Sequence, residues 1–191
     1  MHQSSFRHVQ DLRSRYSVHT GTIVDIGSTD VNGSYRALFP TCRYIGVDIE
    51  PGPGVDVVAL QPYRYPVPSS SADLVISGQA FEHMEFFWLG WLEMCRIVKR
   101  GGLIWLLAPS RGPEHRYPVD CWRFFPDGFR ALAKWSGVEL LEVSTDWEDD
   151  PDPGSASWGD TVGVFRRYPE TVAGWARRFL LRHSIHLFGR T

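Results

Sequence analysis

Short apolar runs separated by polar or helix-like stretches dominate the first half of the chain. Glycine, proline and polar residues bound these runs, which is typical of β-strands. Between residues 82 and 99 the apolar spacing is helical instead, and Gly101 and Gly102 end that helix. Because short strands alternate with helices, we expect βαβ units and a parallel sheet. The predicted strands cover residues 22–26, 42–47, 55–58, 73–77 and 103–108.

The second half of the chain has a different pattern. Segment 109–123 has little periodicity and is predicted to be a loop rich in polar and aromatic residues. A helix is expected at 127–136, followed by strands at 138–147 and 161–167. The acidic segment between these two strands is too short for a crossover helix, so we expect the strands to pair antiparallel.

The two ends of the chain are predicted to be helical. Residues 1–20 form an N-terminal helical segment, and residues 168–191 form a basic, amphipathic C-terminal helix. A helix of this kind packs on its own domain or on a second copy of the chain, which makes a homodimer one expected arrangement. Binding to a membrane surface is the alternative.

Length and composition narrow the class of protein. A chain of 191 residues favours one domain, here 1–191, over two. The formal net charge of −2 gives no support for nucleic-acid binding, which calls for a basic surface. Three scattered cysteines predict neither a disulfide framework nor a zinc site, and they suit the reducing cytoplasm. We find no pattern typical of a signal peptide or a transmembrane segment.

The first predicted strand ends in a pattern that favours a nucleotide-like ligand. Gly27 follows this strand directly, and Asp48 ends the second strand about 20 residues later, the spacing of a carboxylate that binds ribose hydroxyls. The next residues, Ser28, Thr29 and Asp30, do not supply the further glycines of a dinucleotide fingerprint. The polar loop therefore suits an amino-acid moiety better than a pyrophosphate.

Four motifs in order resemble those of class I S-adenosylmethionine-dependent methyltransferases. The family fold is a Rossmann-like α/β fold with a seven-stranded, mostly parallel sheet whose last strand is antiparallel. The two late strands of this chain agree with that topology. The motifs that carry the resemblance are residues 24–28, 46–48, 73–77 with 81–83, and 98–102.

The resemblance implies which residues bind S-adenosylmethionine. Asp25, Gly27 and Ser28 form the loop at the amino-acid part of the cofactor. Asp48 binds the ribose hydroxyls and Ile49 packs against the adenine. The residues implied at the methionine end are Ser77, Gly78 and Gln79.

A methyl acceptor with a hydroxyl group gains from a base that removes its proton. One candidate region is Gln79–His83, where Glu82 and His83 follow the fourth strand. The alternative is that these two residues simply begin a helix, because acidic side chains favour a helix N-terminus. In ubiquinone-pathway O-methyltransferases a similar region holds magnesium, with an acidic residue where Gln79 stands. A magnesium ion at Glu82 and His83 is therefore left open.

The loop after the fifth strand is the second candidate region. His115 is the preferred base, slightly ahead of His83, and Asp120 is the carboxylate that orients it. The alternative is a structural ion pair between Asp120 and Arg123, because such pairs imitate active sites. The residues predicted to bind the acceptor are Arg116, Tyr117, Trp122 and Arg123.

A loop rich in polar and aromatic side chains suits a polyhydroxylated acceptor. The chain resembles actinobacterial sugar O-methyltransferases of the methylmannose-polysaccharide type. We therefore predict methyl transfer to a hydroxyl of a sugar or oligosaccharide, in the biosynthesis of a methylated polysaccharide. One alternative is O- or N-methylation of another small molecule in secondary metabolism. The other is a non-catalytic, cofactor-binding regulatory subunit, although such a relative is expected to lose Gly27 or Asp48, and neither is lost.

Overall fold

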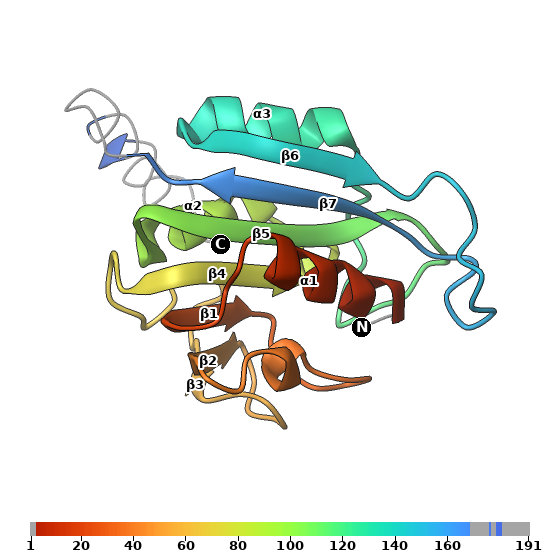
Figure 1. Ribbon diagram of the computed structural model, residues 1–191, viewed down its shortest axis with the longest axis horizontal. Coiled ribbons are helices and arrows are strands. Elements are labelled where there is room, and N and C mark those ends of the chain that lie inside the picture. Colours follow the sequence, from red (N-terminus) through yellow and green to blue (C-terminus); the bar gives the residue numbers. More distant parts are fainter. Residues whose placement is uncertain (1–2, 169–175, 177–178, 181–191) are drawn as a thin grey trace.

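Seven strands form one sheet in the order β3-β2-β1-β4-β5-β7-β6 (Figure 1). The computed structural model describes residues 3–168, 176 and 179–180. Strands β1 to β5 run parallel, whereas β7 is antiparallel to both β5 and β6. The predicted Rossmann-like α/β fold with an antiparallel last strand is confirmed. The elements are α1 Gln3–Arg15, β1 Thr22–Ile26, η1 Tyr35–Leu38, β2 Arg43–Asp48, β3 Val57–Val58, β4 Ala72–Gly78, η2 Phe81–His83, α2 Phe87–Ile97, β5 Val98–Arg111, α3 Pro126–Ser136, β6 Glu139–Thr145 and β7 Gly159–Arg166.

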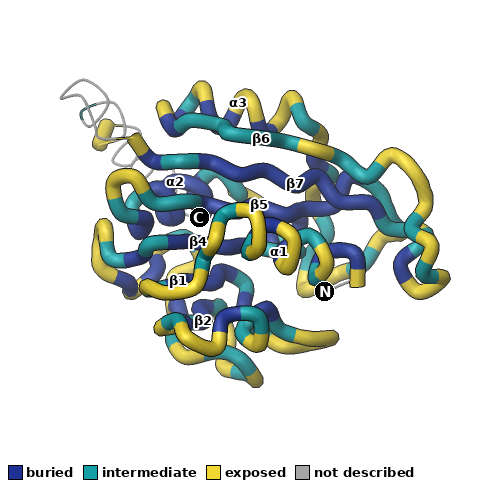
Figure 2. The backbone as a smooth tube through the Cα atoms, in the orientation of Figure 1, coloured by how far each residue is buried: buried dark blue, intermediate teal, exposed yellow. Residues whose placement is uncertain are grey.

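The sheet is covered on both faces, and this explains why its strands are almost wholly apolar. Successive side chains of a strand point to opposite faces. In β5, Ile104 packs in the core beneath α2 and α3, whereas Trp105 packs in the core beneath α1 and η1. Both side chains are fully buried. Figure 2 shows β4, β5 and β7 as the buried centre of the molecule, with exposed residues on the loops and outer helix surfaces.

The predicted helix 82–99 is wrong at its beginning. A 3-10 turn, η2, occupies 81–83, and α2 begins only at Phe87. The chain between them is irregular, because Met84 is extended and the backbone N–H of Phe86 is hydrogen-bonded to the Tyr63 hydroxyl instead of to a preceding helical carbonyl. This break leaves Glu82 and His83 outside the helix, at the carboxyl end of β4.

The predicted N-terminal helical segment is present as α1, which lies across the face of the sheet that also carries η1 (Figure 1). The predicted C-terminal helix at 168–191 lies almost entirely outside the described residues. None of the helices in the described part is both long and apolar enough to cross a membrane.

Candidate functional site

A cavity of about 560 Å³ opens beyond the carboxyl ends of β1, β2 and β4. Ligands of open α/β sheets bind at this edge, and the volume lies in the range of small-molecule and cofactor sites. One of the eight predicted cofactor residues, Ser77, does not line the cavity. It is fully buried in the sheet and its hydroxyl donates a hydrogen bond to the Ile26 carbonyl. The predicted residues that do line it are Asp25, Gly27, Ser28, Asp48, Ile49, Gly78 and Gln79.

Gly27 brings the loop after β1 close to the end of β4. Its φ of 79° lies in the left-handed region that favours glycine. A Cβ at this position would lie 2.4 Å from the Cβ of Ala80, so only glycine fits the approach. Behind the loop, the buried carboxylate of Asp25 accepts a hydrogen bond from the Tyr44 hydroxyl at 2.6 Å. Burial raises the pKa of Asp25 to about 6.

Asp48 joins the ends of β1 and β2. Its Oδ2 accepts the backbone N–H of Thr29 at 2.9 Å, and its Oδ1 accepts that of Ile49 at 2.7 Å. A carboxylate offers about four lone-pair positions, so acceptor capacity remains for the two hydroxyls of a ribose. Ile49 lines the cavity with an exposed apolar side chain, which suits the flat face of an adenine. The residues present therefore fit the predicted cofactor.

At the end of β4, Gly78 and Gln79 make the turn that forms the cavity floor. A Cβ on Gly78 would lie 2.2 Å from the hydroxyl of Tyr35, a cavity residue from η1 that the sequence analysis missed. Gln79 has a φ of 60°, which is uncommon for a residue other than glycine and clusters at functional sites. Its amide donates to Oδ1 of Asp160 at 2.9 Å, and burial raises the pKa of this aspartate to about 6.

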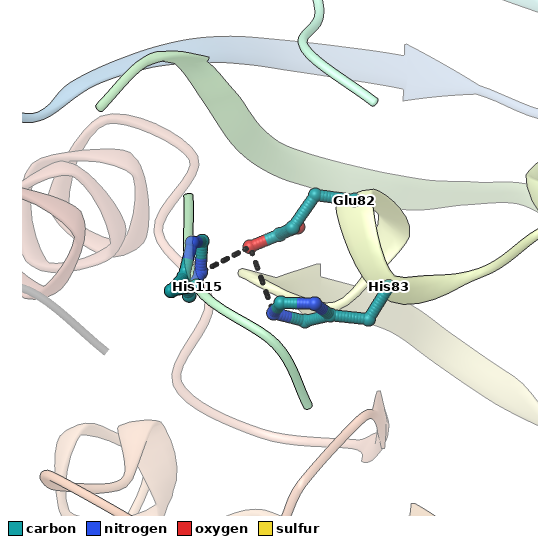
Figure 3. Close-up of side chains that lie close together, drawn as sticks. All are labelled: Glu82, His83 and His115. Carbon is teal, nitrogen blue, oxygen red and sulfur yellow. Dashed lines mark ion pairs between the residues drawn. The ribbon is translucent and has the colours of Figure 1, made fainter. Parts of the chain in front are cut away.

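Two histidines and a glutamate meet at the other end of the cavity (Figure 3). The Nε2 atom of His83 lies 3.6 Å from Glu82 Oε1, and the Nε2 atom of His115 lies 3.8 Å from the same oxygen. Both histidines line the cavity, whereas Glu82 is fully buried behind them. The two predicted candidate bases, which are 32 positions apart in the sequence, therefore belong to one cluster.

Backbone hydrogen bonds hold the acceptor loop against η2. The backbone N–H of Cys121 donates to the carbonyl of Glu82 at 2.7 Å. The His83 Nδ1 lies 2.6 Å from the Val119 carbonyl, which can only accept, so this nitrogen carries the proton. The lone pair of His83 is then on Nε2, on the side of Glu82. These two bonds explain why His115 reaches the cluster.

Burial dominates the electrostatics of the cluster. It raises the pKa of Glu82 to about 8, and neither carboxylate oxygen has a hydrogen-bond partner in another described residue. It also lowers the pKa of His83, whose imidazole is partly enclosed. Asp120 behaves in the opposite way, because the guanidinium of Arg123 holds its pKa well below the usual range.

Asp120 lies near both of its predicted partners. It is paired with Arg123 at 2.5 Å, as the structural alternative expects, and its Oδ2 lies 3.4 Å from His115 Nδ1, which has no hydrogen-bond partner among the described residues. Arg123 thus supports the loop and does not line the cavity. Trp122 is also outside the cavity lining, because its indole N–H donates to the Met84 carbonyl.

Arg116 and Tyr117, two of the residues predicted to bind the acceptor, line the cavity. They form its rim together with Tyr63, which the sequence analysis did not single out. The Tyr117 ring is 59% exposed, so its face is available to a ligand. The remaining cavity residues at this end include Met84 and Pro118, which no motif or pattern indicated.

A comparison with protein families decides what kind of domain this is. Residues 24–106 match the model of a methyltransferase domain family. The match spans β1 to β5 and includes the loops that form the cofactor side of the cavity. The chain carries a class I S-adenosylmethionine-dependent methyltransferase domain.

Solved structures share the fold of this methyltransferase domain at low sequence identity. The 1,6-didemethyltoxoflavin-N1-methyltransferase of Burkholderia thailandensis is 12% identical, with a TM-score of 0.68 over 87% of this chain and 80% of the other. The YcgJ protein of Bacillus subtilis is 13% identical, with a TM-score of 0.61 over 86% of this chain and 100% of the other. The geranyl diphosphate C-methyltransferase of Streptomyces coelicolor is 12% identical, with a TM-score of 0.58 over 84% and 80%. No curated protein matches the sequence.

Two of these enzymes methylate nitrogen and carbon in unlike molecules, as their names state. A shared fold does not determine the acceptor, because function resides in the site built on the fold. The acceptor of this methyltransferase domain must therefore be argued from its own residues.

Proposed function

We propose that the chain transfers a methyl group from S-adenosylmethionine to a hydroxyl of a sugar or oligosaccharide, in the biosynthesis of a methylated polysaccharide. The observation that carries the proposal is the cluster of Glu82, His83 and His115 at the cavity end opposite Asp48. A hydroxyl is a poor nucleophile until its proton is drawn away, and basic side chains are the groups that do this.

The rim of the cavity suits a polyhydroxylated acceptor. Tyr63 and Tyr117 offer ring faces to the apolar face of a sugar ring, and Arg116 offers several N–H donors to hydroxyl oxygens. Arg116 is also paired with Glu114 in the same loop. The cavity thus combines flat apolar surface with hydrogen-bonding groups, as carbohydrate recognition requires.

The reaction needs alignment more than covalent participation by the protein. The cofactor supplies a methyl group on a sulfonium sulfur, and the carbon–sulfur bonding pair leaves with the sulfur as the oxygen–carbon bond forms. The hydroxyl proton passes to an imidazole Nε2 of the cluster, with His115 preferred because Asp120 lies behind its Nδ1. Asp48 and the loop after β1 hold the cofactor, and the acceptor loop orients the hydroxyl.

Magnesium is not part of this proposal. Among the solved structures named above, the Streptomyces enzyme contains Mg²⁺ together with its diphosphate substrate. Magnesium prefers six oxygen ligands in octahedral geometry, whereas this cluster offers two imidazoles and one carboxylate.

We place the reaction in the cytoplasm, because the described cysteines are free thiols. We also propose that 1–191 is one domain, since α1 packs on the same sheet.

The alternatives predict different products. Methylation of another small molecule at oxygen or nitrogen, as the Burkholderia enzyme's name indicates for its own acceptor, remains the second candidate. A non-catalytic, cofactor-binding subunit is the third. Incubation with isotope-labelled S-adenosylmethionine and matched panels of sugars, oligosaccharides and amines separates them by mass spectrometry of the products. Methylated sugars are expected; methylated amines alone, or cofactor binding without any product, would reject the proposal.

His115→Ala tests the role of the cluster in the same assay. Turnover should fall by about 10²- to 10⁴-fold, the usual contribution of a positioned acid or base. Affinity for S-adenosylhomocysteine, measured by isothermal titration calorimetry, should stay unchanged because Asp48 and Gly27 are untouched. His19→Ala, which removes an exposed imidazole elsewhere, is the matched control and should retain full turnover.

A further inference from the structure

Glu82, His83 and His115 face one another across a gap that no hydrogen bond closes. Both Nε2 atoms are aimed at Glu82 Oε1, at 3.6 and 3.8 Å, beyond the 2.7–3.2 Å of an N–H···O bond. One ligand atom from each residue lies within 4.8 Å of the other two. Figure 3 shows the three side chains converging from two segments of the chain onto one point. This arrangement suits a ligand that binds all three atoms in the gap between them.

The burial of the Glu82 carboxylate is a second reason to expect a ligand in this gap. Glu82 is fully buried, yet neither of its oxygens has a hydrogen-bond partner in another residue of the described part. Burying an unpaired polar group costs free energy, and buried carboxylates are normally hydrogen-bonded, paired with a cation or bound to a metal. Arg123, the cation of the neighbouring ion pair, is already engaged by Asp120 at 2.5 Å and does not form an ion pair with Glu82.

The outer nitrogen of His83 is arranged as in metal sites. A ligating histidine commonly uses its other ring nitrogen to donate to a carbonyl or a carboxylate. His83 Nδ1 contacts the Val119 carbonyl at 2.6 Å, which places the ring lone pair on Nε2, the atom aimed at Glu82. His115 Nδ1 lies 3.4 Å from the Asp120 carboxylate and has no hydrogen-bond partner among the described residues.

We propose that Glu82, His83 and His115 bind a divalent transition-metal ion of the zinc and iron(II) class. Two imidazoles and one carboxylate suit such ions, whereas magnesium and calcium prefer oxygen ligands alone. Metal–ligand bonds of about 2.0–2.2 Å put two ligands of a tetrahedral ion roughly 3.3 Å apart. The separations of 3.6 and 3.8 Å from Glu82 Oε1 exceed that value by a few tenths of an ångström, and the ligand atoms of the two histidines lie within 4.8 Å of each other.

The ion would face the cavity, because His83 and His115 line it. Three protein ligands leave a coordination position open, as in catalytic sites. The role of the ion rests on the proposed function: it lowers the pKa of the acceptor hydroxyl, whose proton is released to water before methyl transfer. With a metal bound, the imidazoles would be ligands and would not accept the proton, so the base role proposed above applies to the metal-free cluster.

A second histidine–carboxylate group in the chain provides an internal control. His8, Asp146 and Asp160 also bring ligand atoms within 4.8 Å of one another. There, however, His8 Nε2 and Asp146 Oδ2 are directly hydrogen-bonded at 2.9 Å, so the two atoms satisfy each other. Substitution at His8 should therefore leave metal binding by the full chain unchanged.

The test is titration of the chelator-dialysed full-length protein with Co²⁺, followed by its visible absorption, without cofactor or acceptor. One Co²⁺ should bind per chain and be displaced by Zn²⁺ but not by Mg²⁺. Glu82→Gln and His115→Ala should each weaken binding by more than roughly 100-fold, since loss of mere outer partners costs about 10- to 100-fold. His8→Ala should bind like the wild type. Thermal unfolding checks that each variant folds. If Glu82→Gln does not fold, the Co²⁺ affinity of His115→Ala is the deciding measurement.

Three outcomes would overturn the proposal: no Co²⁺ binding, binding that survives both Glu82→Gln and His115→Ala, or binding lost in His8→Ala. The readout contains no acceptor, so its result is independent of the sugar assignment. Stoichiometric binding together with methylation of amines alone would support the metal site and reject the proposed acceptor. Methylation of sugars by a protein that binds no metal would support the proposed acceptor and reject the metal site.

Discussion

The two ends of the cavity are built in different ways. At the cofactor end, strand tips and glycines set the positions, and Asp48 bonds to the backbone of the loop it faces. At the acceptor end, an irregular loop is held against η2 by contacts such as Cys121 N–H to the Glu82 carbonyl. The first end depends on the sheet, which is the most buried part of the molecule. The second depends on a few hydrogen bonds between segments distant in sequence.

This difference separates binding from chemistry. A sheet edge with a short turn gives a general cofactor site that many enzymes of the fold can share, whereas the loop can change without disturbing it. The family match covers residues 24–106, so it includes η2 with Glu82 and His83 but stops before the acceptor loop. Substitutions at the two ends should therefore affect different measurements.

Asp48→Ala should give the largest effect on the cofactor end. It removes the carboxylate predicted to accept the ribose hydroxyls and also the partners of the Thr29 and Ile49 backbone N–H groups. Hydrogen bonds to a charged group contribute about 1.5–3 kcal/mol each, so affinity for S-adenosylhomocysteine should fall at least about 100-fold. Calorimetric titration measures this. Glu50→Ala, which removes a carboxylate from the same cavity, is the charge control and should bind nearly as well as the wild type.

The pattern expected for Asp48→Ala is the opposite of that for His115→Ala, which should lose turnover and keep cofactor affinity. Undiminished binding by Asp48→Ala would remove the ribose assignment. Equal losses of affinity in both variants would mean that the two ends are not independent, and the comparison would fail.

The sequence predicts the cofactor end better than the acceptor end, for a physical reason. Gly27 and Asp48 follow strands whose period and spacing are local, so their positions can be predicted from the pattern of a sheet. Glu82 and His115 were each identified, but their meeting depends on loop hydrogen bonds that have no sequence signature. Ser77 was assigned to the cofactor because the family resemblance implied it, yet its side chain points into the core.

The position of Asp160 in an apolar strand is a sequence signal for a site residue that the prediction did not use. Asp160 is a fully buried carboxylate in the apolar strand β7, and its bond to Gln79 supports the turn at the cavity floor. A charged residue in a strand that is otherwise buried needs a partner, which is a reason to expect it near a site. The predicted strand began at 161 and so excluded it.

Gly27→Ala tests the point where the cofactor end and the acceptor end of the cavity are in contact. A methyl group there meets Ala80, which precedes η2, so both ends should be disturbed. Gly101→Ala is the matched control: its φ of 81° is nearly equal to the 79° of Gly27, but no atom lies within 4 Å of its added Cβ.

The backbone strain is common to the two variants, and only Gly27→Ala adds overpacking, which typically costs about 1–3 kcal/mol. The free energy of unfolding, measured with urea, should therefore be lower in Gly27→Ala than in Gly101→Ala by about that amount. Cofactor affinity should fall only in Gly27→Ala. Equal unfolding free energies would show that the loop after β1 relaxes freely and that close packing does not define the cofactor end.

Asp160→Asn should give the smallest effect, and one that depends on pH. Burial, together with the negative charge of Asp146, raises the folded-state pKa of Asp160 from its ordinary 3.8 to about 6, despite the neighbouring Gln79 amide and the charge of His8. The folded state therefore binds the proton more tightly than the unfolded state, and this contribution to stability is lost as pH rises from about 4 through 6. At 1.36 kcal/mol per pKa unit the loss is at most about 3 kcal/mol.

In Asp160→Asn, the asparagine keeps an oxygen for the Gln79 amide and has no charge to bury. Urea unfolding at pH 8 should find the variant more stable than the wild type by about 1–3 kcal/mol, and the difference should shrink toward zero near pH 4. Asp25, whose pKa is also raised to about 6, is present in both proteins and cancels in the subtraction. A difference that stays constant with pH would mean that the pKa of Asp160 is the same in the folded and unfolded states, so that its buried carboxylate is ionised in the folded protein and burial does not raise its pKa.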